Sequence, residues 1–224
     1  MLQALSRRGV RALSTSASIL PEFNVLFEDI KADAAKNKLI KVSKLTNLFK
    51  TATSKADLEL STEALKIYER KHIDPIEVTA GEFVKACIQH DAADVAVSAL
   101  SQNRRIGLFV NAGSLNKLLV HFKNAKDDAN LIAVFDEAKK FDIRYNPVSY
   151  HLAISAHLRS GDVEKALAVL EAAAAAKKID SKTVNHVLFQ LTKSEAADQV
   201  EAVVALLKKH NVALDESGAK LASA

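Results

Sequence analysis

The 224-residue sequence has no tryptophan, one cysteine, three prolines and six glycines. A single cysteine excludes an internal disulfide framework. So few prolines and glycines leave little material for the turns of an all-β fold, and no apolar run approaches the roughly 18 residues of a membrane-spanning helix. Aromatic residues make up only 5% of the chain. Alanine, leucine, lysine and glutamate dominate instead, and this composition indicates an all-helical protein.

An excess of one charge is also lacking outside the N-terminus. The chain carries 31 basic and 27 acidic residues, a net charge of +4. Three of the basic residues, Arg7, Arg8 and Arg11, stand in residues 1–20, which contain no acid. The rest of the chain therefore has 28 basic and 27 acidic residues. Phosphate binding needs a concentrated basic surface. The overall charge therefore does not predict a nucleic-acid-binding protein.

Residues 1–20 have the composition of a mitochondrial transit peptide, because they are rich in Arg, Ser and Ala and free of acids. Arginines interrupt every stretch that would serve as the apolar part of a secretory signal. We therefore interpret residues 1–20 as a transit peptide and expect a location in the mitochondrial matrix or at the matrix face of the inner membrane. A disordered N-terminal tail is the alternative.

A basic doublet followed by Ile or Val recurs along the chain. The apolar residues after the five doublets stand at intervals of 33, 37, 36 and 33 residues, at Ile73, Ile106, Ile143, Ile179 and Val212. Short polar turns recur between them, at Thr53–Lys55, His90–Ala92, Lys126–Asp128, Ser160–Asp162 and Ser194–Ala196. Two interleaved series with the same period predict five helix–turn–helix units.

The segments between these turns carry helical periodicity, and in one of them a single apolar face is formed by Leu115, Leu118, Leu119 and Phe122. Each helix pair has an apolar side that it is too small to cover alone, and stacking of successive pairs covers it. The predicted fold is all-α, a short right-handed α-solenoid of about five helix–turn–helix repeats in residues 42–214.

The two ends of the repeat domain have patterns of their own. Residues 21–41 are expected to form an amphipathic helix that caps the first unit, with an apolar side of Phe23, Leu26, Phe27 and Ile30. A docking helix for a partner is the alternative interpretation of this segment. The small, polar residues 215–224 are expected to form a flexible tail.

Two units resemble the pentatricopeptide repeat family, whose unit of about 35 residues reads roughly D-x-x-T-Y-N-x-L-I, then a turn with Gly, then E-A-x-x-L-F. The segments that carry the resemblance are Asn146–Ile154, Ser160–Leu170 and Asp180–Leu188. The tetratricopeptide repeat is the rival interpretation, but its Trp, Gly and terminal Pro marks are missing. The resemblance implies a helical-repeat protein.

The resemblance also implies that a small polar residue on the first helix of each unit selects an RNA base. The alignment places Glu82, Lys117, Leu152 and His186 there. None is the expected Asn, Thr or Ser, so sequence-specific RNA reading is predicted to be lost. Nonspecific RNA binding stays open through a basic stripe along the first helices, formed by Lys117, Lys123, Lys182 and His186. The alternative is that these side chains form a solvated surface. The basic doublets are interpreted as charges that favour helix C-termini.

No catalytic or metal-binding pattern stands out. The histidines lack the spacing of an H-E-x-x-H zinc site, and no phosphate-binding glycine loop or G-x-S-x-G elbow is present. Cys87 and His157 align with Phe122 and Leu191 in an inward column, so we expect a buried thiol and a core histidine bonded to a neighbour. The chain is expected to be no enzyme and to use no cofactor, metal or small-molecule substrate.

Three functions follow as hypotheses. The first is a non-catalytic adaptor that binds protein subunits as a structural part of a mitochondrial assembly, the mitoribosome or a respiratory or ATP synthase complex. The alternative is an RNA-binding pentatricopeptide protein in mitochondrial RNA processing, stability or translation. The third is a matrix enzyme whose site is built from scattered residues. The surface expected to face RNA or a partner includes Lys117, Leu152, Lys182 and His186.

The transit-peptide interpretation predicts that the mature protein begins between Ser14 and Glu22, where the arginine-rich, acid-free composition ends. N-terminal sequencing of the protein from mitochondria measures this position. An intact Met1 on the matrix protein would contradict the interpretation.

Overall fold

The computed structural model describes residues 20–194 and 197–223, in which every regular element is a helix. Helix α1 (Phe23–Ala35) precedes five hairpins, and helix α12 (Glu216–Ala222) follows them. The hairpins are α2–α3 (Val42–Thr51, Lys55–Arg70), α4–α5 (Glu77–Gln89, Ala93–Ser101), α6–α7 (Ala112–Asn124, Asp128–Ala138), α8–α9 (Pro147–Arg159, Val163–Ala175) and α10–α11 (Ser181–Lys193, Ala197–Lys209). Two short 3-10 helices, η1 (Arg105–Phe109) and η2 (Lys139–Phe141), lie between hairpins. The all-α fold with five helix–turn–helix units is confirmed.

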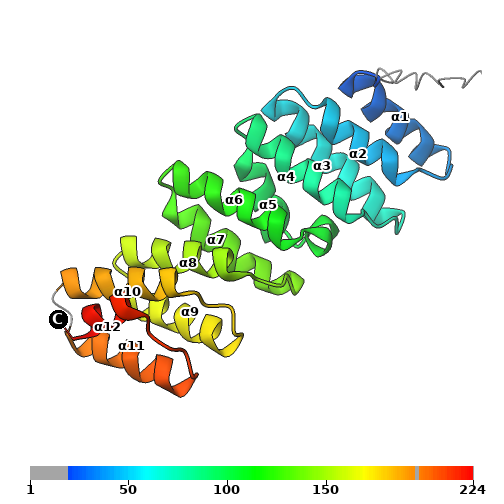
Figure 1. The fold of residues 1–224 in the computed structure, drawn as a ribbon. Helices are drawn as coiled ribbons and strands as arrows, with labels where there is room; N and C mark the ends of the chain where they lie inside the picture. The colour runs from blue at the N-terminus through cyan, green and yellow to red at the C-terminus, as the bar shows by residue number, and fades with distance from the viewer. Residues whose placement is uncertain (1–19, 195–196, 224) are drawn as a thin grey trace, which may run out of the picture.

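The hairpins stack in chain order, and the result is an elongated α-solenoid (Figure 1). The first helices α2, α4, α6, α8, α10 and α12 each contact the next one along the chain. Among the second helices, α3 contacts α1 and α5, α5 contacts α7, and α9 contacts α11. The solenoid therefore has a first-helix layer and a second-helix layer. Within residues 20–194 and 197–223, no helix is long and apolar enough to cross a membrane.

The turns repeat with the same period as the helices. Residues with positive φ lie inside hairpins at Asp91, Lys126 and Gly161, and after α1 or a second helix at Asn37, His72, Asn103, Asp142, Lys177 and Asn211. The amide of Ala92 donates to the Cys87 carbonyl at 2.8 Å, in the hydrogen-bond pattern of a Schellman helix end. Polar residues and glycine tolerate this left-handed backbone better than β-branched ones. The predicted polar turns therefore mark the helix ends, except that residues 195–196 of the last turn lie outside the described residues.

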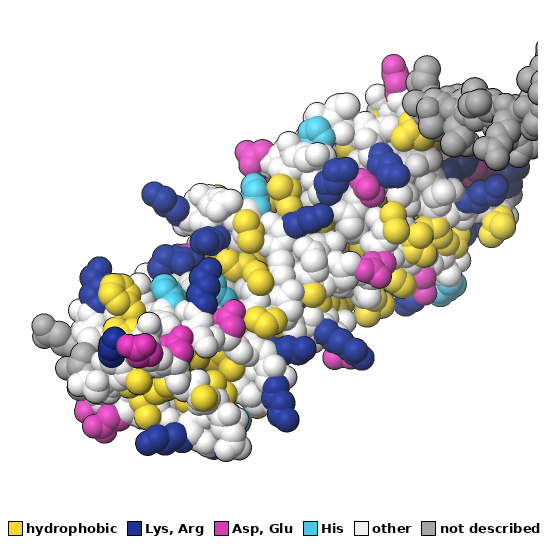
Figure 2. Space-filling model, viewed as in Figure 1, with side chains coloured by type: hydrophobic (Ala, Val, Ile, Leu, Met, Phe, Trp, Pro, Cys, Tyr) yellow, Lys and Arg dark blue, Asp and Glu magenta, His cyan; other side chains and the backbone are white. Residues whose placement is uncertain are grey.

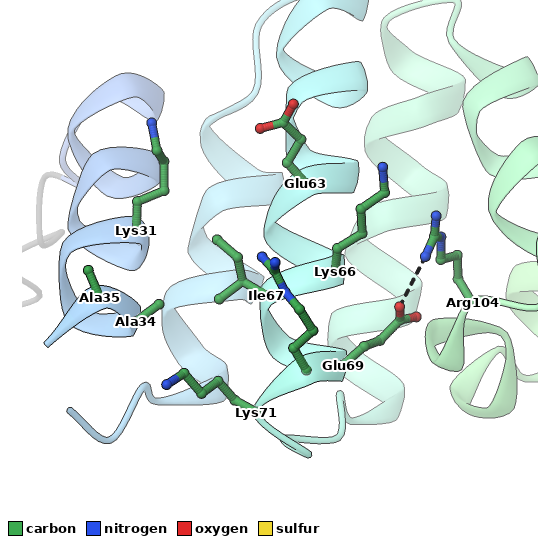
Figure 3. Close-up of a pocket in the computed structure, with 10 residues that line it drawn as sticks. Lys31, Ala34, Ala35, Glu63, Lys66, Ile67, Glu69, Lys71 and Arg104 are labelled. Carbon is green, nitrogen blue, oxygen red and sulfur yellow. Dashed lines mark hydrogen bonds and ion pairs between the residues drawn. The ribbon is translucent and has the colours of Figure 1, made fainter. Parts of the chain in front are cut away.

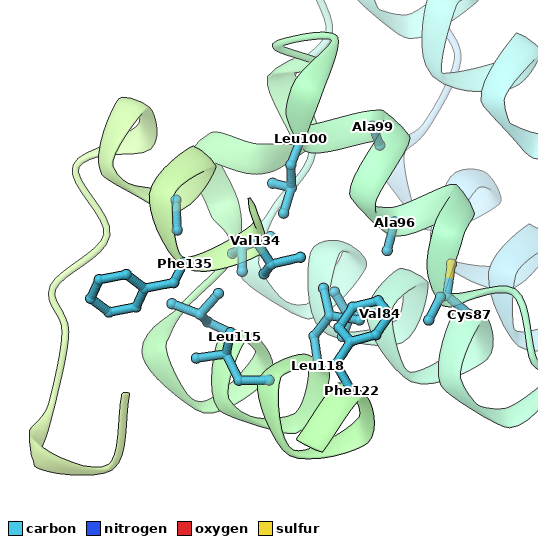
Figure 4. Close-up of a cluster of buried hydrophobic side chains, with 14 of the residues drawn as sticks. Val84, Cys87, Ala96, Ala99, Leu100, Leu115, Leu118, Phe122, Val134 and Phe135 are labelled. Carbon is cyan, nitrogen blue, oxygen red and sulfur yellow. The ribbon is translucent and has the colours of Figure 1, made fainter. Parts of the chain in front are cut away.

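One apolar core runs between the two layers. Figure 4 shows the part where Leu118 and Phe122 of α6 lie near Val84 of α4 and Ala96 of α5. The small side chain of Ala96 lets these helices approach closely. Each buried leucine or phenylalanine stabilises the fold by about 1.5–3 kcal/mol relative to an exposed one, so the stacking interfaces carry most of the stability.

Equivalent positions of successive first helices form apolar columns. Side chains at most 2% exposed make up one column, Phe83, Leu118, Ala153 and Val187. Side chains at most 5% exposed make up another, Cys87, Phe122, His157 and Leu191. Both face inward as predicted, but one expectation for His157 is wrong, because its Nδ1 makes no hydrogen bond with any described residue. An apolar column offers a ring nitrogen few polar partners.

Two predictions for the ends are also wrong. Helix α1 ends at Ala35 instead of continuing to residue 41, because Asn37 has a φ of 50° that no α-helix accommodates. The expected flexible tail contains α12, which packs on α10. Asp215 caps α12, since its Oδ1 accepts a hydrogen bond from the Gly218 amide at 2.8 Å. Asp180 caps α10 in the same way, so the tail begins as a sixth unit would.

The columns predict unequal effects of one substitution at adjacent positions. Leu118→Asp should lower the free energy of unfolding by several kcal/mol, because it buries an unpaired carboxylate. Lys117→Asp should change it by no more than about 0.5 kcal/mol, because Lys117 is exposed. Urea denaturation measures both changes. Equal losses would mean that the helix register is not the one described.

The unpartnered nitrogen of His157 predicts a stabilising substitution. His157→Leu should leave the protein at least as stable at pH 7, because leucine fits the apolar column without a polar nitrogen. Burial lowers the pKa of folded His157, so the native protein loses stability as the pH falls below about 6.5, the unfolded value. The variant should lose less between pH 7.5 and 5.5 in thermal melts, and an unchanged slope would contradict this account.

Candidate nucleic-acid interface

Acidic residues are kept away from most of the first-helix layer. Helices α2, α6, α8 and α10 contain no Asp or Glu but hold seven basic residues, Lys44, Lys50, Lys117, Lys123, Arg159, Lys182 and Lys193. The second helices of the five hairpins hold 12 acidic and six basic residues. Figure 2 shows Lys and Arg side chains, with histidines among them, gathered over α6, α8 and α10. The near-zero charge of the repeat domain therefore hides a separation of charge between the layers.

The predicted basic stripe lies on this layer. Lys117 and Lys123 project from α6 into solvent, Lys182 does so from α10, and His186 is half-buried. Lys44 is drawn out of the stripe, because its Nζ lies 2.6 Å from a carboxylate oxygen of Asp33 in α1. Arg159 of α8 is also engaged, because its guanidinium donates to both carboxylate oxygens of Asp128 in α7. The lysines available for a ligand are therefore mainly those of α6 and α10.

Two histidines lie against each other within the stripe. The ring centroids of His151 in α8 and His186 in α10 are 5.5 Å apart, and His151 Nδ1 lies 3.1 Å from Thr183 Oγ1. Burial lowers the pKa of both rings, and the neighbouring His186 lowers that of His151 further, while Arg159 and Lys182 act on His186. Both rings are therefore neutral near pH 7, and a phosphate bound beside them would favour their protonation.

Leu152 does not belong to this surface, so its placement there is wrong. Its side chain is only 4% exposed, whereas the preceding His151 is half-buried and polar. One residue along a helix turns a side chain by about 100°. The surface position of α8 is therefore His151, one residue before the predicted Leu152. The equivalents of His151 in α6 and α10 are Asn116 and Asn185. The predicted loss of sequence-specific reading rested on the later position and no longer follows.

These polar residues connect successive first helices. Asn116 Nδ2 donates to Asn146 Oδ1 at 3.0 Å, and Asn116 Oδ1 accepts from Ser149 Oγ at 2.7 Å. Asn185 Nδ2 donates to the Asp215 carboxylate at 3.0 Å. The sequence pattern did not reveal this polar ladder, although an amide or imidazole recurs there at intervals of 35 and 34 residues. Each ladder residue is half-buried, at the junction between two units.

The N-terminal part of the layer is less basic. A hollow of about 410 Å³ between the C-terminal ends of α2 and α4 is lined by Lys50, Lys85 and His90, together with Glu82. Glu82 is half-buried and lies 3.4 Å from Lys85 Nζ. A carboxylate at this point opposes an anionic ligand, so the strongest attraction for phosphate lies over α6, α8 and α10.

The basic doublets do more than favour helix ends. Arg104 Nη1 lies 3.2 Å from Glu69 Oε2, and Lys209 Nζ lies 2.7 Å from Glu171 Oε1. In both cases the acid belongs to the preceding second helix. The Lys209–Glu171 pair is exposed, and an exposed pair stabilises a fold by at most about 1 kcal/mol. Both pairs neutralise an acid of the second-helix layer.

Other candidate residues offer little chemistry. Cys87 is buried, and burial raises the pKa of its thiol to about 12, so almost no thiolate forms at pH 7. Among the described residues, no group of three or more His, Cys, Asp or Glu is placed to hold a metal ion. The arrangement on the first-helix layer is suited to bind an extended anion through charge and hydrogen bonds.

No protein-family model matches this sequence, and no curated protein matches it. Similar solved structures include two of the pentatricopeptide repeat protein PPR10 in complex with an 18-nt psaJ RNA element, one of them with three cysteine-to-serine substitutions. Each is 13% identical with a TM-score of 0.33, and the match covers 90% of this chain and 41% of PPR10. This chain thus spans less than half the length of the protein it matches. So distant a likeness carries no conclusion about function, and the helical-repeat fold is evident from the chain's own hairpins.

Proposed function

We propose that this chain is a non-catalytic helical-repeat protein that binds single-stranded RNA along its first-helix layer. The observation that carries the proposal is the absence of Asp and Glu from α2, α6, α8 and α10, beside seven basic residues. Lys44 and Arg159 are paired with acids of neighbouring helices, and the other five, all lysines, form a row of cations that attracts a phosphate chain. Successive stacked units present the same kind of surface at regular intervals, as a strand of nucleotides does.

The polar ladder supports contact with bases as well as with phosphates. Asn116, His151 and Asn185 provide one half-buried amide or imidazole at each unit junction, next to the cations of the stripe. Amide and imidazole groups hydrogen-bond to the edges of unstacked bases. The ladder thus gives the layer a group for bases alongside the groups for phosphates.

The composition of residues 1–20 supports a mitochondrial location. In that location the proposed ligand is a mitochondrial RNA, and the proposed role lies in its processing, stability or translation. The matrix, or the matrix face of the inner membrane, is where such RNA would be met.

A second candidate function is the non-catalytic adaptor, a structural subunit of the mitoribosome or of a respiratory or ATP synthase complex. The observation that favours it is a pair of exposed apolar side chains at the start of α4, Ile76 at 52% and Val78 at 59% exposure. Large apolar side chains exposed at the surface suit a protein interface. Ribonuclease treatment of mitochondrial extract separates the two functions, because an RNA tether is lost and a protein contact is kept.

The RNA proposal predicts a loss of affinity when the stripe is removed. The variant with Lys117→Ala, Lys182→Ala and His186→Ala should bind a single-stranded RNA of about 20 nucleotides at least about tenfold more weakly at low salt. The slope of log K against log salt should become shallower by about 1.4, since each lysine–phosphate contact on a single strand contributes about 0.7. Fluorescence anisotropy over a salt series measures both.

A matched control variant, Lys178→Ala with Lys208→Ala, removes the same lysine charge from the second-helix side. It should keep the affinity within about twofold, because Lys208 belongs to the second helix α11 and Lys178 follows the C-terminal end of the second helix α9. Equal weakening of the two variants would show that the binding reflects overall charge and not this surface.

A further inference from the structure

We propose that the hollow between α1 and α3 is a docking site for an acidic segment of a partner protein. The hollow has a volume of about 1000 Å³ and is lined by residues of α1 and α3, with Glu69 paired to Arg104 at one side (Figure 3). These helices belong to the second-helix layer, whereas the proposed RNA surface lies on the first-helix layer. Its lining includes Ala34 and Ala35 of α1 and Ile67 of α3. This proposal does not rest on RNA binding.

The hollow exists because α1 ends in small side chains. Ala34 and Ala35 occupy its last turn, and neither reaches across to α3. Ile67, only 8% exposed, contributes apolar surface to the lining. A ligand that fits here needs some apolar surface in addition to charge.

Cations dominate the remaining lining. Lys31, Lys66, Arg70, Lys71 and Arg104 face two acids, Glu63 and Glu69. Both carboxylate oxygens of Glu69 are already engaged, one by the Arg104 guanidinium at 3.2 Å and the other by the backbone amide that follows Arg104 at 2.9 Å.

Two of the cations that line the hollow have no such partner. Lys66 and Arg70 make no hydrogen bond or ion pair with any residue in the described ranges. Lys71 donates only to the neutral side chain of Asn37, at 2.5 Å. Lys31 is paired with Glu28 at 2.8 Å, so the positive charge that the chain does not neutralise comes from Lys66, Arg70 and Lys71.

Ion pairs between successive second-helix segments show how cations are neutralised elsewhere in the solenoid. Arg104 pairs with Glu69 of the preceding second helix, and Lys209 pairs with Glu171 in the same sense. Arg70 has no acid of this kind, although it lines the same hollow as Ala35. A carboxylate from another protein would supply the partner that Arg70 lacks.

The lining favours an acidic peptide over RNA. Glu63, which has no cation partner in the described part of the chain, lies beside the cations and repels a continuous phosphate backbone. A peptide places its carboxylates at chosen points and its apolar side chains against Ile67. The planar guanidinium of Arg70 matches a carboxylate with two parallel hydrogen bonds.

The test uses the full chain and a labelled synthetic peptide of about 12 residues that alternates Glu and Leu. The variant Lys66→Glu with Arg70→Glu should weaken its binding by about tenfold for each lost pair. The control Lys178→Glu with Lys208→Glu changes the net charge by the same amount elsewhere and should weaken it by less than about threefold.

A second variant places a carboxylate for Arg70 within the chain itself. Ala35→Glu should pair with Arg70 and reduce peptide binding about tenfold, whereas the uncharged control Ala35→Gln should not. Ala35 is exposed, so both substitutions leave the core intact. Circular dichroism melts check that the variants stay folded.

Three results would overturn the proposal. The first is equal peptide binding by the Lys66→Glu, Arg70→Glu variant and its Lys178→Glu, Lys208→Glu control. The second is equal binding of the Glu–Leu peptide and of a peptide with Gln in place of Glu. The third is an equal effect of Ala35→Glu and Ala35→Gln on peptide binding. A loss of RNA affinity in Lys66→Glu with Arg70→Glu, beyond that of its control, would assign the hollow to RNA instead. If the stripe variant keeps its RNA affinity, the proposed RNA function is wrong, but the result with the peptide still holds.

Discussion

Each helical hairpin of this protein depends on covering its apolar columns with the next hairpin. The column of Phe83, Leu118, Ala153 and Val187 passes through four units, and no side chain in it is more than 2% exposed. Because contacts run between neighbouring units, stability comes from a series of similar interfaces and not from one central core. The two ends of such a series need covers. Helix α1 packs on α2 and α3, and α12 packs on α10.

This stacking also decides which charges stand on which surface. First helices meet through small polar groups, as where the Thr46 and Thr79 hydroxyls lie 2.7 Å apart, and such contacts need no acid. Second helices are joined by ion pairs such as Arg104 with Glu69, so their acids are partly neutralised within the solenoid. The first-helix layer keeps unopposed lysines as a result. Charge segregation and repeat stacking are thus two consequences of the same interfaces.

The two proposed binding surfaces occupy different layers, so one ligand does not block the other. The stripe over α6, α8 and α10 is suited to a phosphate chain, and the hollow between α1 and α3 is suited to carboxylates. An RNA strand and an acidic segment of a protein would bind to the same molecule at once. In that case the adaptor and the RNA-binding protein are one function, in which the solenoid holds an RNA against a protein partner.

The sequence by itself determined the repeat period, the five helix pairs, their turns and the buried columns, because helix formation, capping and amphipathic periodicity are local. It did not determine how far the buried side extends around each first helix, and so buried Leu152 was placed on the surface in place of the neighbouring His151. That choice depends on how packing rotates each helix, where one residue changes the direction by about 100°. Tertiary structure alone also decided the order of α12, the polar ladder and the hollow, because each arises where residues some 30 or more positions apart meet.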